Sequence, residues 1–282
     1  MYNKVVISFS PTKLAPIAQA IRSDILHSIY TAGSGHLAGS LGVVEILTYL
    51  YFVALNLRPQ QPDWHERDLF FLSAGHLCPA LYATLAQRGF FARKILSSLR
   101  QFNSPLQGHP RRQLSLGIEC SAGSLGQGIS QAVGAAYALK QSGSKRKVVV
   151  LASDGEQQEG QCWEAYLFAA HYHLDNLTLI VDVNGIQQSG LVKQVISLED
   201  LAAKFLSFNF ACTRPAGNDF SALHQAWQQL AAVKNYPKAI LAATTPGKGV
   251  PLLENNYHYH AGMPSAALWQ QIFAASKTEV AA

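Results

Sequence analysis

Charged residues are scarce in this chain: Asp, Glu, Lys and Arg make up 14% of its 282 residues, whereas hydrophobic residues make up 49%. This composition allows a well-packed core, and the low charge indicates a large buried interface. Lys and Arg are scattered, which excludes the basic stripe of a nucleic-acid-binding protein. We interpret the one basic run, Lys145–Lys147, as a solvated loop. The net charge of +5 suits phosphorylated substrates.

The cysteines are not spaced as C-x-x-C, so the sequence indicates neither a dithiol motif nor a zinc site. Free thiols are typical of a cytoplasmic enzyme. Residues 1–12 lack the charged and apolar regions of a signal peptide, and the most apolar stretch, Leu41–Leu57, is too short for a membrane span and carries Glu45. We therefore expect a cytoplasmic protein without a membrane partner. The cysteines are Cys78, Cys120, Cys162 and Cys212.

Apolar runs rich in β-branched residues alternate with helical patterns along the chain. This alternation predicts an α/β fold, with a mostly parallel sheet and helices on both faces. No linker or repeat divides the sequence, so we expect one domain over residues 1–282, with its core at about 13–275. Strands are predicted at 68–72, 148–152, 178–183, 208–212 and 238–243. Helices are predicted at 13–30, 41–57, 77–87, 92–101, 128–140, 161–173, 198–206 and 220–233, and from Pro264 and Ser265 to a tail that frays after Ser276.

Polar residues directly follow two of the predicted strands. Asp154 comes after strand 148–152 and Asn184 after strand 178–183, so both lie at the carboxyl edge of the sheet, where open α/β sheets bind ligands. The carboxylate of Asp154, the amide oxygen of Asn184 and the backbone carbonyl of Ile186 form a ligand set suited to Mg²⁺, which commonly shares its shell with phosphates. Gly155 allows the backbone to approach a diphosphate closely.

Four histidines lie in glycine-containing loops, and the first three each follow a glycine: His36, His76, His109 and His260. The loop over 32–40 holds three glycines, and the segment 103–120 is long and irregular, as binding loops often are. A single loop histidine is most often a polar surface residue. Several that converge on the carboxyl edge favour a site.

The stretches 153–161 (SDGEQQEGQ) and 175–187 (DNLTLIVDVNGIQ) resemble the GDG…N motif of thiamine diphosphate enzymes in its transketolase form. Further segments resemble transketolase motifs in the same order. The resemblance covers about residues 15–265 and points to the amino-terminal, diphosphate-binding half of the family, especially the separate N-terminal subunit of split transketolases. These segments are SGHLAGSLG (34–42), RDLFFLSAGH (67–76), GHP (108–110), GIE…GSLGQG (117–128), AGND (216–219) and TTPGKG…YH (244–260).

Several positions depart from the family pattern. Ser153 replaces a glycine, Leu37 and Ala38 replace a Pro-Gly pair, and Ser124 replaces a proline. Arg111 stands where glutamate is common, and Asn218 where histidine is common.

The resemblance implies transfer of a two-carbon ketol unit, with thiamine diphosphate and Mg²⁺ (or Ca²⁺ or Mn²⁺) as cofactors. The implied metal ligands are Asp154, Asn184 and Ile186. The implied cofactor contacts are His76, Gly123, Ser124, Leu125, Gly155, Glu156, Asn184, Ile186 and His260. The implied catalytic residues are His36, His76, His109 and His260, of which His260 moves a hydroxyl proton; its spacing to Pro264 favours it over the nearby His258.

In this family a separate pyrimidine-binding domain supplies a glutamate for the cofactor and arginines for the sugar phosphate. The resemblance therefore implies that the partner is a C-terminal transketolase subunit, with sugar phosphates as substrates and an α2β2 assembly. Glu159 and Glu164 resemble glutamates that meet across the family's dimer interface; a loop charge and a helix-surface charge are equally good interpretations.

Four alternatives stay open at this point. The chain could belong to another thiamine diphosphate enzyme, such as a deoxyxylulose-phosphate synthase or a keto-acid dehydrogenase α-subunit, although the histidine loops favour transketolase. It could serve a split enzyme of a specialised sugar pathway. It could be a non-catalytic regulatory subunit, which the departures at Ser153, Leu37, Arg111 and Asn218 would explain. A Rossmann dehydrogenase is the weakest alternative, because no G-x-G-x-x-G follows the first strand.

Overall fold

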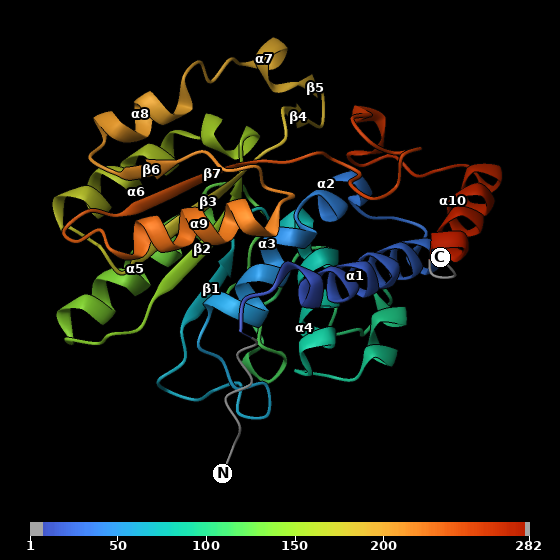
Figure 1. Ribbon diagram of the computed structural model, residues 1–282, viewed down its shortest axis with the longest axis horizontal. Coiled ribbons are helices and arrows are strands. Elements are labelled where there is room, and N and C mark those ends of the chain that lie inside the picture. The colour runs from blue at the N-terminus through green and yellow to red at the C-terminus, as the bar shows by residue number, and fades with distance from the viewer. Residues whose placement is uncertain (1–7, 280–282) are drawn as a thin grey trace.

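The computed structural model describes residues 8–279, in which a five-stranded parallel sheet carries helices on both faces (Figure 1). The strand order is β1-β2-β3-β7-β6, and each neighbouring pair is parallel. The predicted fold class is confirmed. The strands are β1 (Leu69–Leu72), β2 (Val148–Ser153), β3 (Leu177–Val183), β6 (Ala211–Thr213) and β7 (Lys238–Ala243).

Alternate residues of the strands face two separate hydrophobic clusters. In β2, Val149 and Leu151 belong to one cluster, and Val148, Val150 and Ala152 belong to the other. Every residue of β2 is therefore buried, which explains why the strand reads as a continuous apolar run. The first cluster packs under α1 (Pro11–Ala32), α3 (Val44–Tyr49), α4 (Cys78–Arg88) and α9 (Phe220–Ala231). The second packs under α5 (Gln127–Gln141), α6 (Gly160–His171) and α8 (Leu201–Ser207).

The predicted loop at 32–40 is correct only at residues 33–36, and the single predicted helix at 41–57 is wrong. Helix α2 (Leu37–Gly42) already begins inside the predicted loop, and α3 follows it after a break at Val43. A π-helical turn, η1 (Leu50–Ala54), then ends the run. The residues of α2 and α3 are all buried, so the sequence has no polar face there from which a helix boundary could be read.

The structure contains further short elements between β3 and α8 that the sequence does not predict. The chain forms a two-stranded hairpin, β4 (Ile186–Gln187) with β5 (Gly190–Leu191), followed by α7 (Val192–Val195). Elements of two to four residues are too short to show a periodic pattern.

The remaining predictions are shifted or shortened. Asp200 caps α8 by accepting the amides of Ala202 and Ala203, so this helix begins at Leu201. The segment 92–101 holds only a 3₁₀ helix, η3 (Arg93–Ser98). Further 3₁₀ turns are η2 (Gly75–Leu77), η4 (Leu114–Leu116), η5 (Gly155–Gln158) and η6 (Tyr257–Tyr259).

The last helix is α10 (Ala266–Glu279). The predicted fraying after Ser276 extends to residues 280–282, which lie outside the described residues. The expected absence of a signal peptide rests on residues 1–12, of which 1–7 also lie outside them. Within residues 8–279, no helix combines the length and apolar character needed to cross a membrane.

Candidate active site

The turns that follow β1, β2 and β3 lie next to one another because these strands are neighbours in the sheet. Ser153 at the end of β2 is in register with Asp182 of β3, and the amide of Asp154 donates to the carbonyl of Asp182 at 3.0 Å. The predicted meeting of Asp154 and Asn184 at one edge of the sheet is therefore observed.

Asp154 presents a buried carboxylate without a cationic neighbour. Its side chain accepts hydrogen bonds from the amides of Gly155, at 2.8 Å, and Gly185, at 2.7 Å. None of the ion pairs among residues 8–279 includes it. Burial raises the pKa of Asp154 to about 6, against the lowering effect of the surrounding backbone donors. A bound cation would relieve this desolvation, so the carboxylate fits a metal ligand.

Asn184 and Ile186 are held beside Asp154 by their own contacts. The amide nitrogen of Asn184 donates to Asp182 at 2.7 Å, and its oxygen accepts the amide of Ile186 at 2.8 Å. Asp182 also accepts the hydroxyl of Thr244, and burial raises the pKa of Asp182 to about 7. Sequence reasoning missed Asp182, although an acidic residue inside the otherwise apolar run LTLIVDV was a usable indication.

A cavity of about 450 Å³ opens beside these three residues. The hairpin and α7 form its outer wall, including Leu191 and Val192. Among residues 8–279, no three His, Cys, Asp or Glu side chains form a metal-binding group. The predicted ligand set contains one carboxylate, one amide and one carbonyl, which are hard oxygen donors of the kind Mg²⁺ accepts.

All four loop histidines come together at the carboxyl edge. The ring of His36 lies at the centre, with centroid distances of 5.1 Å to His76, 5.6 Å to His260 and 6.2 Å to His109. The rings of His76 and His260 are 5.3 Å apart. His258 stays outside this group, exposed and packed against Tyr257.

The histidine cluster favours neutral imidazoles. Burial, followed by repulsion from His260, His109 and Arg100, lowers the pKa of His36 to about 4. Burial is also the largest cause that lowers the pKa of the other three. The Nδ1 atom of His36 is buried and has no hydrogen-bond partner among the described residues. It is thus available to a bound molecule, as a donor or an acceptor according to its tautomer.

Glu156 is fully buried and joins three loops of the site. One carboxylate oxygen accepts the hydroxyl of Ser73 at 2.5 Å and the amide of Gly126 at 2.6 Å. The other accepts the amide of Ser153 at 3.2 Å, while the Ser153 hydroxyl accepts the amide of Glu156 at 3.3 Å. This reciprocal pair is a capping box. Ser153, the departure from the family glycine, therefore directs its hydroxyl to the chain itself.

The loop that carries Gly123, Ser124 and Leu125 packs against the turn after β1. A Cβ atom on Gly75 would lie 2.9 Å from the carbonyl of Ala122, so only glycine permits this approach. Gly123 and Ser124 are exposed and Leu125 is half-buried, and a Cβ atom on Gly123 would lie 3.9 Å from the side chain of His109. Gly155 is half-buried beneath Gln187 of the hairpin.

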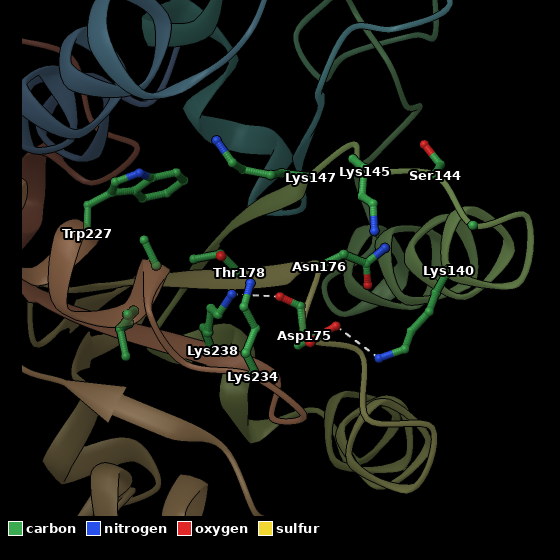
Figure 2. A pocket seen from close by; sticks show the side chains of 13 residues that line it. Lys140, Ser144, Lys145, Lys147, Asp175, Asn176, Thr178, Trp227, Lys234 and Lys238 are labelled. Atoms are coloured by element: carbon green, nitrogen blue, oxygen red, sulfur yellow. Dashed lines mark hydrogen bonds and ion pairs between the residues drawn. The ribbon is translucent and has the colours of Figure 1, made fainter.

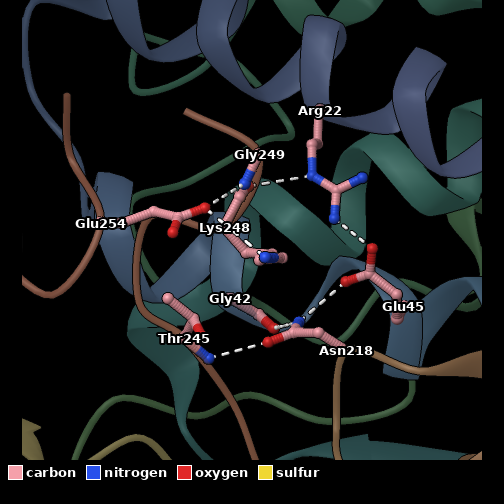
Figure 3. Close-up of polar contacts among 8 residues, drawn as sticks. All are labelled: Arg22, Gly42, Glu45, Asn218, Thr245, Lys248, Gly249 and Glu254. Carbon is pink, nitrogen blue, oxygen red and sulfur yellow. Dashed lines mark hydrogen bonds and ion pairs between the residues drawn. The ribbon is translucent and has the colours of Figure 1, made fainter. Parts of the chain in front are cut away.

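Asn218, the departure from the family histidine, connects three segments (Figure 3). Its amide nitrogen donates to the carbonyl of Gly42 and to Glu45, each at 2.8 Å, and its oxygen accepts the amide of Thr245 at 2.8 Å. Glu45 also pairs with Arg22, which donates to the carbonyl of Lys248 at 3.0 Å. The substitution thus replaces a ring by a side chain whose amide nitrogen and oxygen are both hydrogen-bonded.

Comparison with known proteins agrees with this geometry. Residues 14–279 match the family described as transketolase, thiamine diphosphate binding domain. One chain of the apulose-4-phosphate transketolase of Phocaeicola vulgatus is 35% identical over 250 residues, which cover 89% of each chain. A 6-deoxy-6-sulfo-D-fructose transketolase subunit of Clostridium sp. is 35% identical over 262 residues, or 93% of this chain and 95% of that one. Transketolase from Campylobacter jejuni superposes with a TM-score of 0.87 at 29% identity.

The fold and the matched residues define a thiamine diphosphate-binding domain. The chain belongs to the transketolase family. The alignment with the Campylobacter jejuni structure covers 95% of this chain and 43% of that one, so the chain spans less than half of that transketolase.

Proposed function

We propose that the chain is the cofactor-binding subunit of a two-chain transketolase, which transfers a two-carbon ketol unit from a ketose to an aldose. Relatives that match it over 89% and 95% of their own length are named as transketolase subunits. The observation that carries the proposal is the cluster of four histidines, one of them with an unpartnered nitrogen, next to a buried carboxylate without a counter-ion.

Asp154, Asn184 and Ile186 would hold Mg²⁺ at this site. Asp154 supplies the charge, Asn184 an amide oxygen and Ile186 its backbone carbonyl. Binding requires the amide oxygen of Asn184 to exchange its present contact with the amide of Ile186, 2.8 Å away, for the ion.

Thiamine diphosphate, when bound, supplies the nucleophilic carbon and the electron sink of ketol transfer. Gly155, Glu156 and His76 would position its diphosphate, and Gly123, Ser124 and Leu125 its pyrimidine ring. The carboxylate of Glu156 is already saturated by Ser73, Gly126 and Ser153. Its contribution is therefore to fix the loops that carry the other contacts.

The histidines would bind the sugar and move protons. Neutral imidazoles can donate to one oxygen and accept from another, and the lowered pKa values keep all four rings neutral at pH 7. His36 and His109 would contact sugar hydroxyls. His260 would take the hydroxyl proton during carbon–carbon cleavage, within reach of His36 and His76, which can relay it.

The substrate is proposed to be a sugar of a specialised pathway, with xylulose 5-phosphate as the alternative. The named relatives act on apulose 4-phosphate and 6-deoxy-6-sulfo-D-fructose. Arg111, two residues after His109, is exposed and stands where glutamate is common, which reverses the charge at this position of the loop. This change supports an altered sugar preference. The assembled histidines argue against a non-catalytic subunit.

Self-association in an α2β2 complex is supported by an aromatic patch on α5 and α6. Leu167, Phe168 and Tyr172 are 60%, 40% and 38% exposed. Tyr137 of α5 contacts the last two, with ring centroids 5.3 and 4.7 Å apart. Glu164 is exposed on the same helix. Exposed aromatic groups of this extent are typical of interfaces.

The test measures ketol transfer by the chain alone and with a pyrimidine-domain chain from a neighbouring gene. Thiamine diphosphate and Mg²⁺ are present, with apulose 4-phosphate, 6-deoxy-6-sulfo-D-fructose or xylulose 5-phosphate as donor. We expect activity only in the mixture, highest with a specialised donor, and lost in Asp154→Ala. Activity of the chain alone would contradict the two-chain proposal. Absence of ketol-transfer activity with every donor, while calorimetry still shows cofactor binding, would contradict the proposed ketol transfer.

A further inference from the structure

The amino-terminal edge of the sheet, opposite the candidate active site, carries a second cavity. Its volume is about 440 Å³, and it lies between the ends of α5 and α9 and the beginnings of β3 and β7 (Figure 2). The six residues of β2 separate the two edges, a length of about 20 Å at the usual rise per residue. This cavity is therefore distinct from the carboxyl-edge site.

Five lysines and a single aspartate line this cavity, so its charge is strongly positive. Lys234 and Lys238 point toward Asp175, and Lys145 extends toward Asn176 (Figure 2). Lys145 and Lys147 belong to the basic run that the sequence alone indicates as a solvated loop. The five lysines are Lys140, Lys145, Lys147, Lys234 and Lys238.

Asp175 offsets only part of this charge, because one carboxylate faces five lysines and its oxygens already accept hydrogen bonds. One carboxylate oxygen accepts Lys140 at 2.9 Å and the other accepts the amide of Asn235 at 3.1 Å. Its backbone carbonyl accepts Lys238 at 2.6 Å. Lys145 and Lys234 have no hydrogen-bond or ion-pair partner within residues 8–279, and both are exposed.

The lysines act on one another electrostatically. Burial lowers the pKa of Lys238, Asp175 opposes the change, and Lys234, Lys147 and Lys140 lower the pKa further. Lys147 lies 3.9 Å from Asp68, whose carboxylate already accepts two backbone amides. An anion placed between these ammonium groups would relieve the repulsion that remains after their contacts with Asp175 and Asp68.

The shape and the walls indicate the class of anion. A volume near 440 Å³ is in the range of small-molecule sites and too small for a folded partner. Lysine ammonium groups are compact charges that bind phosphate oxygens well. Trp227 and Leu230 supply an apolar wall for the uncharged part of a ligand. We propose that this amino-edge cavity binds a small phosphorylated compound that carries at least two negative charges.

The test titrates pyrophosphate into the full chain by calorimetry, without Mg²⁺ and at constant ionic strength. Lys145→Ala/Lys234→Ala removes the two unpartnered lysines. Lys13→Ala/Lys94→Ala, which removes two exposed lysines elsewhere, is the matched control. We expect the cavity variant to bind about tenfold or more weakly, a loss of about 1.4 kcal/mol, and the control to bind as the wild type does.

An NMR measurement distinguishes binding in this cavity from binding at the carboxyl edge. The indole N–H resonance of Trp227, assigned with Trp227→Phe, should shift on addition of pyrophosphate in the wild type and not in the cavity variant. Equal pyrophosphate affinity in the wild type and the cavity variant would overturn the proposal. Citrate binding more tightly than pyrophosphate at equal charge would overturn the assignment to phosphate.

Discussion

The two edges of the sheet carry opposite chemistry on the same strands. At the carboxyl edge, the polar groups are buried, and burial moves Asp154, Asp182 and His36 toward their neutral forms. At the amino edge, three of the five lysines are exposed and the other two, Lys140 and Lys238, are half-buried. The comparison teaches that one set of strands can hold buried, desolvated polar groups at one edge and a more exposed cavity lined by lysines at the other.

The largest effect, on catalytic activity, is expected for a substitution in the histidine cluster at the carboxyl edge. Replacing His36 by Asn should lower kcat/KM of the reconstituted enzyme by about 10²- to 10⁴-fold, because it removes the central imidazole of the cluster. His258→Asn is the control, since His258 is exposed and outside the cluster. Equal losses in both variants, at unchanged melting temperature, would break the distinction between cluster and surface histidines.

A smaller effect, on the free energy of unfolding, is expected when the buried Glu156 is replaced and not when the exposed Glu164 is replaced. Glu156→Gln should lower the free energy of unfolding by about 1–3 kcal/mol, because an amide presents one oxygen where three donors now converge. Glu164 is exposed, and Glu164→Gln should change stability by less than about 0.5 kcal/mol. Urea unfolding of the two variants measures the difference. A stability loss no greater in Glu156→Gln than in Glu164→Gln would show that the three contacts do not hold the loops.

The last effect concerns pH. The folded-state pKa of His36 is about 4, below its ordinary 6.5, so between these values the unfolded chain binds a proton that the folded chain does not. Stability should fall as the pH drops from 6.5, and the loss should be complete below about 4. His36→Asn should flatten this slope. The charged and titratable groups that face His36 are His76, His109, His260 and Arg100.

Lys234→Gln at the amino edge is the control for this slope, because Lys234 is exposed and lies at the opposite edge of the sheet from His36. Unfolding in urea at a series of pH values measures both variants. An unchanged slope in His36→Asn would mean that burial does not hold this imidazole neutral.

The sequence predicts most of the strands and helices, but fewer of the short elements between them and none of the long-range contacts of Glu156. Strand β7 lies at the predicted residues 238–243, and the positions of Asp154 and Asn184 follow from strand ends, because apolar runs and their polar successors are local patterns. The helix break at Val43 and the short hairpin after β3 are not predicted, because no local pattern marks them. The contacts of Glu156 with Ser73 and Gly126 join positions far apart in sequence, which no single segment reveals.

The network around Asn218 has a consequence for motion. The segment after β7, which leads toward His260, is tied through Thr245 to Asn218 and from there to Gly42 and Glu45. Independent fluctuation of this segment is therefore suppressed, and opening requires several hydrogen bonds to break in one concerted event. The amide hydrogen of Thr245 should exchange with solvent only through that event, which makes its exchange rate a measure of how often the segment after β7 opens.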